Sequence, residues 1–213
     1  MVQKTVSSKR RGRPPAYDPG DALTRAMEVF WDAGYAATSL DELAAATGMN
    51  RPSLYGAFGD KRALYLKTLE HYGAGGQLRR ALAAAGTLRQ SLERVYELAI
   101  ALYLSGRIGP RGCFLIGTAT TEAVKSAEVR AALASQLREL DDVFEARIRR
   151  ARDEGEISPE ADPRALAKLA SAVLHSLALR ARAGDPRRSL DAIAAAGVAA
   201  VCGRAAPTPS RRP

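Results

Sequence analysis

Cysteine and histidine are scarce in this chain. Of 213 residues only two are Cys and two are His, and Cys113 and Cys202 are too few for the disulfide framework of a small secreted domain. These four residues also lack the close spacing of metal ligands, so neither a structural metal nor a metal sensor is expected. The sequence thus indicates a reduced protein without a cofactor.

Long hydrophobic runs are missing as well. The longest apolar stretches, near residues 95–104 and 190–202, are interrupted or short against the ~20 residues that cross a bilayer. The sequence shows no hydrophobic run of the signal-peptide kind near its first residues. We therefore expect no membrane association and predict a cytoplasmic protein.

Aromatic residues are few, and apolar and polar residues do not alternate as they do in strands. Phe, Trp and Tyr make up 6% of the sequence, which is rich in Ala, Leu and Arg, so an all-helical protein is favoured. Domains of ~100–150 residues leave room for two in a chain of this length. An enzyme is not expected, because no nucleophile is paired with a base and no phosphate-binding glycine loop follows a strand. Glu122 and Asp141-Asp142 are interpreted as surface charges.

Positive charge is unevenly distributed. The formal net charge is +9, yet residues 18–62 hold four Lys or Arg against seven Asp or Glu. Residues 1–17 carry five basic residues and no acidic one, namely Lys4, Lys9, Arg10, Arg11 and Arg13. This polar segment is expected to be a disordered basic arm, and residues 204–213, with three prolines, a disordered tail.

Residues 39–61 have the pattern of a helix-turn-helix. Ser39 and Glu42 can form a capping box at the start of a first helix, since each side chain can accept from the other residue's amide. Gly48 can end that helix and reverse the chain, because a left-handed backbone costs glycine little. The same spacing also fits two packed helices with no role in DNA binding.

The second helix of this pattern carries the polar groups of a DNA-reading surface. Asn50 is a suitable N-cap for a helix that begins near Arg51, and Pro52 is tolerated in its first turn. Arg51, Pro52 and Ser53, followed by Tyr55, lie where a recognition helix meets base edges and phosphates.

Residues from about 22 to 72 resemble the TetR family of transcriptional regulators. The matching positions are Ala26, Phe30, Gly34-Tyr35, Thr38-Ser39-Leu40, Leu43-Ala44, Gly48, Ser53-Leu54-Tyr55, Phe58, Asp60-Lys61 and Leu64. The resemblance implies an all-α protein with a three-helix DNA-binding domain at 18–62 and a helical ligand-binding and dimerisation domain at 63–203. It also implies that six residues touch DNA: Ser39, Arg51, Pro52, Ser53, Tyr55 and Lys61, with Tyr55 and Lys61 mainly on phosphates.

The helix-turn-helix segment differs from many relatives at three positions, and these differences are expected to weaken its contacts with DNA. Gly56 and Ala57 stand where many relatives carry larger residues, and Asp41 where some carry a basic one. The arm is a candidate source of additional affinity, because Arg11-Gly12-Arg13-Pro14 resembles the core of an AT-hook. Our hypothesis is that Arg11 and Arg13 enter the minor groove beside the half-site; the alternative is a solvated tail that adds only non-specific attraction.

Further helices are expected over residues 19–33, 78–85, 88–105, 112–124 and 128–154, with two more near 163–183 and 187–203. By resemblance the last two pair with their copies in a homodimer; alternatively they complete a monomeric core. A homodimer would read two half-sites ~34–36 Å apart as an inverted repeat in a double-stranded operator.

The resemblance further implies a repressor that an unidentified small-molecule inducer releases from a palindromic operator. Aromatic and polar residues on the middle helices are the candidates for its pocket, namely Tyr96, Tyr103, Phe114, Thr118, Glu122 and Phe144. Each of them alone also fits an ordinary core or surface role. A ligand-independent DNA-binding regulator is the alternative.

Cys113 suggests one more alternative, a sensor of oxidants or electrophiles. It follows Arg111-Gly112 at a predicted helix N-terminus, where the helix dipole and the guanidinium would lower the thiol pKa. A small buried apolar residue is the other interpretation of Cys113.

Overall fold

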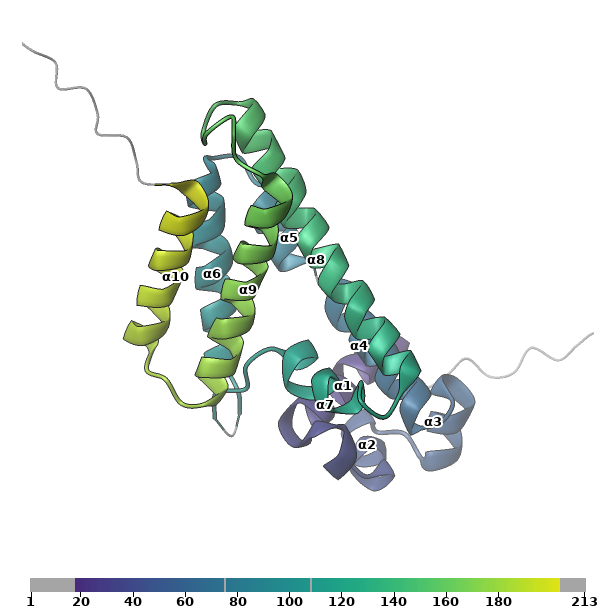
Figure 1. Ribbon diagram of the computed structural model, residues 1–213. Helices are drawn as coiled ribbons and strands as arrows, with labels where there is room; N and C mark the ends of the chain where they lie inside the picture. Colours follow the sequence, from purple (N-terminus) through teal and green to yellow (C-terminus); the bar gives the residue numbers. More distant parts are fainter. Residues whose placement is uncertain (1–17, 75, 108, 204–213) are drawn as a thin grey trace, which may run out of the picture.

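Side-chain caps set the helix boundaries in the computed structural model, which describes residues 18–74, 76–107 and 109–203 (Figure 1). Asp18 caps α1 (Pro19–Ala37) by accepting from the Gly20 amide at 2.7 Å. Regular helix geometry in α1 stops at Gly34, where φ is 80°. The helix predicted over 19–33 is therefore confirmed, with one additional turn beyond Gly34.

Ten further elements follow. They are α2 (Leu40–Thr47), α3 (Arg51–Phe58), α4 (Lys61–Ala74), α5 (Gln77–Ala83), α6 (Leu88–Leu104), the π-helix η1 (Leu115–Ala119), α7 (Thr120–Glu122), α8 (Ala127–Asp153), α9 (Pro163–Arg182) and α10 (Arg187–Cys202). The described ranges contain no strand, and the predicted all-α class is confirmed. None of these helices is both long and apolar enough to traverse a bilayer.

The helix predicted over 112–124 is wrong in its first part. The amides of Arg111 and Gly112 both donate to the Tyr103 carbonyl, at 2.9 and 3.1 Å, which ties this segment back to the end of α6. Because these amides are engaged outside a helix, helical structure starts only after Cys113, as η1 followed by the single turn α7.

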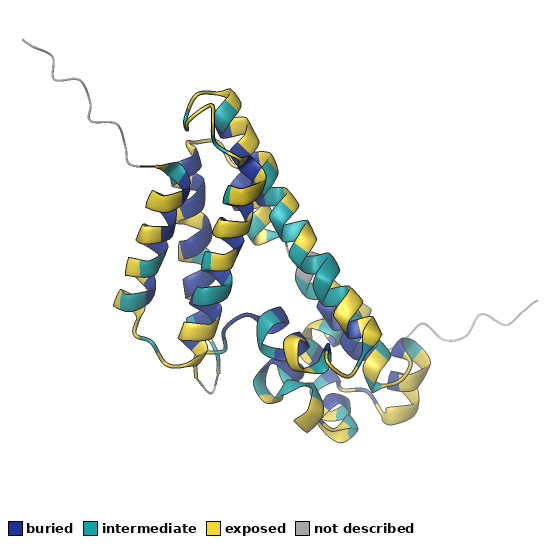
Figure 2. Ribbon diagram, in the orientation of Figure 1, coloured by how far each residue is buried: buried dark blue, intermediate teal, exposed yellow. Residues whose placement is uncertain are grey.

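Two groups of helices are joined by the long helix α8 (Figure 1). At one end α6, α9 and α10 lie side by side, with their buried faces turned toward one another (Figure 2). At the other end α1, α2, α3 and the start of α4 gather, and α8 extends from α9 to α4. The segment with η1 contacts α1 as well as α9, so it connects the two groups directly.

Candidate nucleic-acid interface

The N-terminus of α2 has the predicted capping box. Ser39 Oγ accepts from the Glu42 amide at 3.1 Å, and the Ser39 amide donates to Glu42 Oε2 at 2.6 Å. The second of these hydrogen bonds lowers the pKa of Glu42. At the other end of α2, Gly48 takes φ 70° and its amide donates to the Ala44 carbonyl. The turn predicted at Gly48 is thus present.

The recognition helix α3 begins as predicted at Arg51. Asn50 Oδ1 accepts from the Ser53 amide at 2.9 Å, and Pro52 lies in the first turn. Leu43, Met49, Leu54 and Phe58 are buried and join α2 to α3. The four polar or ring-bearing positions on the opposite side are exposed, namely Arg51, Pro52, Ser53 and Tyr55.

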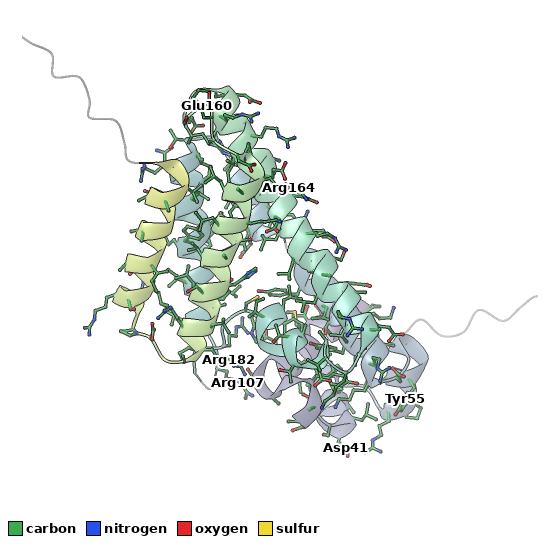
Figure 3. All side chains as sticks on the ribbon, viewed as in Figure 1. Asp41, Tyr55, Arg107, Glu160, Arg164 and Arg182 are labelled. Atoms are coloured by element: carbon green, nitrogen blue, oxygen red, sulfur yellow. The ribbon has the colours of Figure 1, made fainter. Side chains whose placement is uncertain are left out.

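This exposed face is free of other described elements. Tyr55 is 47% exposed, and Figure 3 shows Tyr55 and Asp41 on the outer side of the N-terminal helices, away from α9 and α10. The predicted DNA-contacting residues of α3 are therefore brought together on one accessible surface.

Arg51 has a partner that the sequence did not predict. Its Nε donates to Asp41 Oδ1 at 2.8 Å, and its Nη2 donates to Asp41 Oδ2 at 2.6 Å. This two-point contact joins the first turns of α2 and α3, and the hydrogen bond to Asp41 raises the pKa of Arg51. The only sign of this pair in the sequence is that the first turns of the two helices carry opposite charges. The angle between the helices decides whether these charges meet.

Lys61 begins α4 at the edge of the same group of helices. Its Nζ lies 4.6 Å from the centroid of the Tyr35 ring, within the range of a cation–π contact. Tyr35 packs against the rings of Phe30 and Tyr65, so its position is fixed. The ammonium group is thereby held in a half-buried site. Arg11 and Arg13, the candidates in the basic arm, lie outside the described residues.

The six candidate pocket residues do not form one group. Tyr96 is buried between α6 and α9, where its hydroxyl donates to the Ala170 carbonyl at 3.2 Å. Phe144 is fully buried on α8. Both residues have the contacts of core side chains.

Phe114, Thr118 and Glu122 come together around Tyr65, a residue that was not among the candidates. Thr118 Oγ1 lies 2.7 Å from the Tyr65 hydroxyl, the Phe114 ring packs edge-on at 6.1 Å, and the Glu122 charge also acts on Tyr65. Burial raises the pKa of Tyr65 to about 12. The sixth candidate, Tyr103, is buried nearby beside Cys113. Tyr65 of α4 and Phe114 at the start of η1 form the centre of a packed aromatic cluster.

Cavities open elsewhere on the molecule. A groove of about 450 Å³ between α5 and α8 is lined by Arg79, Leu82, Ala83, Glu139, Asp142, Val143, Ala146, Arg147 and Arg150. A second hollow of about 540 Å³ lies along α9, beside His175 and Leu179. Burial lowers the pKa of His175. None of the six candidate residues lines either cavity.

The lowered pKa predicted for Cys113 is wrong. Cys113 is only 8% exposed, its thiol lies 3.4 Å from the Tyr72 hydroxyl, and burial raises the pKa of this thiol. The Arg111 guanidinium does not approach the sulfur to counteract this, because it lies over the Trp31 ring and pairs with Glu28. Among the described residues, no group of three or more His, Cys, Asp or Glu side chains could hold a metal ion.

Comparisons with known proteins agree with this architecture. Residues 22–68 match the bacterial regulatory proteins of the tetR family, and residues 91–196 match the tetracyclin repressor-like C-terminal domain. The chain is 31% identical to the HTH-type transcriptional repressor ComR of Escherichia coli (strain K12), over 87% of this chain and 90% of ComR.

A solved structure gives the same result. The chain is 35% identical to a cysteine mutant of the TetR family transcriptional regulator CifR, solved with 26-bp double-strand operator DNA, with a TM-score of 0.79 over 88% of this chain and 99% of that one. The prediction of a transcriptional regulator that is not an enzyme is confirmed by these relatives. The chain belongs to the tetR family of bacterial regulatory proteins.

Proposed function

We propose that this protein is a homodimeric repressor that binds an inverted-repeat operator and leaves it when a small-molecule inducer binds. The observation that carries the proposal is the free face of α3, where Arg51, Ser53 and Tyr55 are exposed together at the helix that enters a major groove in helix-turn-helix proteins. The relative CifR was solved with operator DNA, which supports the same role for this face.

The DNA interface consists of the helix-turn-helix face and the arm. Arg51, Pro52 and Ser53 contact base edges, Ser39 contacts the backbone from the start of α2, and Tyr55 and Lys61 contact phosphates. Arg11 and Arg13 enter the adjacent minor groove and supply affinity that the acidic segment 18–62 lacks.

Dimerisation through α9 and α10 is supported by apolar groups that none of the described residues covers. Leu169 and Leu179, on α9, are 41% and 58% exposed. Burial of such side chains against a second copy is favourable, because it removes apolar surface from water. The dimer would hold two copies of α3 at a fixed separation, as an inverted repeat requires.

The proposed functions belong to two separate parts of the chain, each made of its own helices. Residues 18–62 read DNA, and residues 63–203 bind the inducer and dimerise. Inducer release requires a ligand that prefers the conformation with lower DNA affinity. The groove between α5 and α8 is an accessible place for such a ligand, whereas the aromatic cluster around Tyr65 is already packed. A repressor acts where the chromosome is, so the protein is assigned to the cytoplasm.

Selection of bound sites from random DNA, with the full-length chain, tests this function. We expect an enriched inverted repeat, and sedimentation equilibrium should give a dimer at micromolar concentration. Arg51→Ala should strongly reduce the enrichment, whereas Arg94→Ala, which removes an exposed Arg from α6, should not. Recovery of random sequences by the wild-type chain, or tight operator binding by a monomer, would reject the proposal.

A further inference from the structure

The recognition helix presents Arg51 in one defined orientation. The Asp41 carboxylate binds its Nε and Nη2 at once, at 2.8 and 2.6 Å. Both side chains are largely exposed, 54% for Arg51 and 73% for Asp41, and Figure 3 shows Asp41 on the same outer side of the N-terminal helices as Tyr55. Packing against neighbouring side chains therefore does not fix the Arg51 side chain, and the Asp41 carboxylate is the group that orients it.

The contact leaves the DNA-binding edge of the guanidinium available. A guanidinium has five N–H groups in a rigid plane, and Asp41 accepts one from Nε and one from Nη2. Among the described residues no acceptor contacts Nη1, so one N–H on Nη2 and both on Nη1 remain. The edge formed by Nη1 and Nη2 can donate two parallel hydrogen bonds, the pattern that guanine O6 and N7 accept in the major groove.

Asp41 also changes which groups attract Arg51. A free arginine at this position would be drawn to the nearest phosphate, a contact that carries no sequence information. The carboxylate repels phosphates and neutralises the guanidinium, so the pair gains little from DNA of arbitrary sequence. The free Nη1–Nη2 edge of the guanidinium can still donate its two hydrogen bonds to guanine.

We propose that Asp41 is a positioning residue that determines specificity: it holds Arg51 so that the guanidinium reads one guanine in each half-site and contributes little to non-specific binding. This inference rests on the proposed operator binding. It assigns a role to an acidic residue at a position where some relatives carry a basic one.

Asp41→Asn tests the role of the charge, because the amide is nearly the same size as the carboxylate. We expect the preference for guanine over the other bases at one position of each half-site to fall about tenfold, within the range of a bidentate contact. Affinity for random DNA should rise, and its dependence on log salt should steepen by about 0.9 per protomer, because one more cation reaches a phosphate.

Two further variants separate the effect of the position of the Asp41 carboxylate from the effect of its charge. Asp41→Glu keeps the charge and moves the carboxylate, so the guanine preference should fall while the salt dependence stays unchanged. Glu97→Gln is the matched control, because it adds the same charge by breaking an exposed ion pair with Arg94, at 3.5 Å on α6. It should alter neither base preference nor salt dependence.

A double-mutant cycle links the effect to Arg51. In an Arg51→Ala background, Asp41→Asn should leave the base preference unchanged, since the reading group is already absent. Circular dichroism and the thermal midpoint establish that each variant is folded. An Asp41→Asn chain that keeps the wild-type guanine preference, or one that changes it equally without Arg51, overturns the inference while the proposed function stands. A wild-type chain that selects no sequence overturns both.

Discussion

The indole Nε1 of Trp31 donates a hydrogen bond of 3.2 Å to the backbone carbonyl of Arg111. The Arg111 guanidinium lies over the same ring, 3.9 Å from its centroid, and the same carbonyl also accepts from Arg182 Nη1 at 3.0 Å. Figure 3 places Arg182 at the end of α9 that is nearest to this segment. One residue between α6 and η1 thus connects α1, which supports the DNA-binding face, with α9, which carries the proposed dimer surface.

Trp31→Phe should destabilise the chain by about 1–3 kcal/mol, because it removes a donor and leaves a small void in a buried site. The Arg111 carbonyl still has Arg182 as a partner in this variant. When Arg182→Met is added, the carbonyl loses both side-chain donors, so the double variant should cost about 0.5 kcal/mol or more beyond the sum of the single changes. Urea denaturation of the four proteins measures this; additive effects would show that the two contacts are independent.

Substitution of Gly112 by alanine should destabilise the chain in two ways, through the backbone conformation and through a steric clash, and the two can be measured separately. Its φ is +63°, and a Cβ there would lie 2.7 Å from the Ala178 carbonyl oxygen. Gly155 also has positive φ, +78°, but no atom lies within 4 Å of a Cβ built there. Gly155→Ala should cost about 1–2 kcal/mol for the backbone conformation alone. Gly112→Ala should cost more, because α9 must also move.

Chemical denaturation of both alanine variants gives the difference directly. Equal losses of stability would mean that α9 yields to the added methyl group without cost. Reduced operator affinity in Gly112→Ala, beyond that in Gly155→Ala, is expected if the spacing between η1 and α9 affects the DNA-binding helices.

Close packing of α9 on α10 depends on Gly197. A Cβ at this position would lie 2.8 and 2.9 Å from the two methyl carbons of Val173, and a β-branched side chain has little freedom to turn away. Gly197→Ala should therefore destabilise the chain by about 1–3 kcal/mol through overpacking. Val173→Ala should restore much of this loss in the double variant, as the thermal midpoints would show; failure of the second change to compensate would contradict the contact.

Local signals predicted the helix boundaries well. Ser39, Asn50 and Asp18 lie within three residues of the amides that they cap, so their role follows from the sequence pattern. The same is true of the turn at Gly48, where the backbone conformation suits glycine.

Contacts between distant segments could not be predicted in the same way. The pair of Arg51 with Asp41 depends on the angle between α2 and α3, and the Trp31–Arg111 contact joins residues 80 positions apart. Cys113 shows the consequence. Its place near a helix start suggested a lowered pKa, but the aromatic residues around it, which come from α4 and α6, bury the thiol and reverse the shift.

The raised pKa of Cys113 gives stability a specific pH dependence. In the unfolded chain the thiol loses its proton near its ordinary value of 9.0, whereas the buried thiol does so only at higher pH, because burial disfavours the thiolate. Above pH 9 the unfolded state therefore binds fewer protons than the native state, and the free energy of unfolding falls as pH rises. The contribution of Cys113 to the free energy of unfolding is therefore at its maximum below pH 9 and is lost above it. Burial raises the pKa of Tyr72 and Tyr103 in the same way, and their effect begins near pH 10.

Denaturation at pH 8.0 to 10.5 should thus show a plateau up to about pH 9 and a decline above it, of which Cys113 supplies at most about 1.4 kcal/mol per pH unit. Cys113→Ala removes this part of the slope between pH 9 and 10 and leaves the decline that the buried tyrosines cause, Tyr65 among them. Cys202→Ala is a suitable control, because that thiol is less buried and should contribute less. A wild-type chain that becomes more stable above pH 9 would show that the Cys113 thiolate is favoured in the native state, and would restore Cys113 as a candidate sensor of electrophiles.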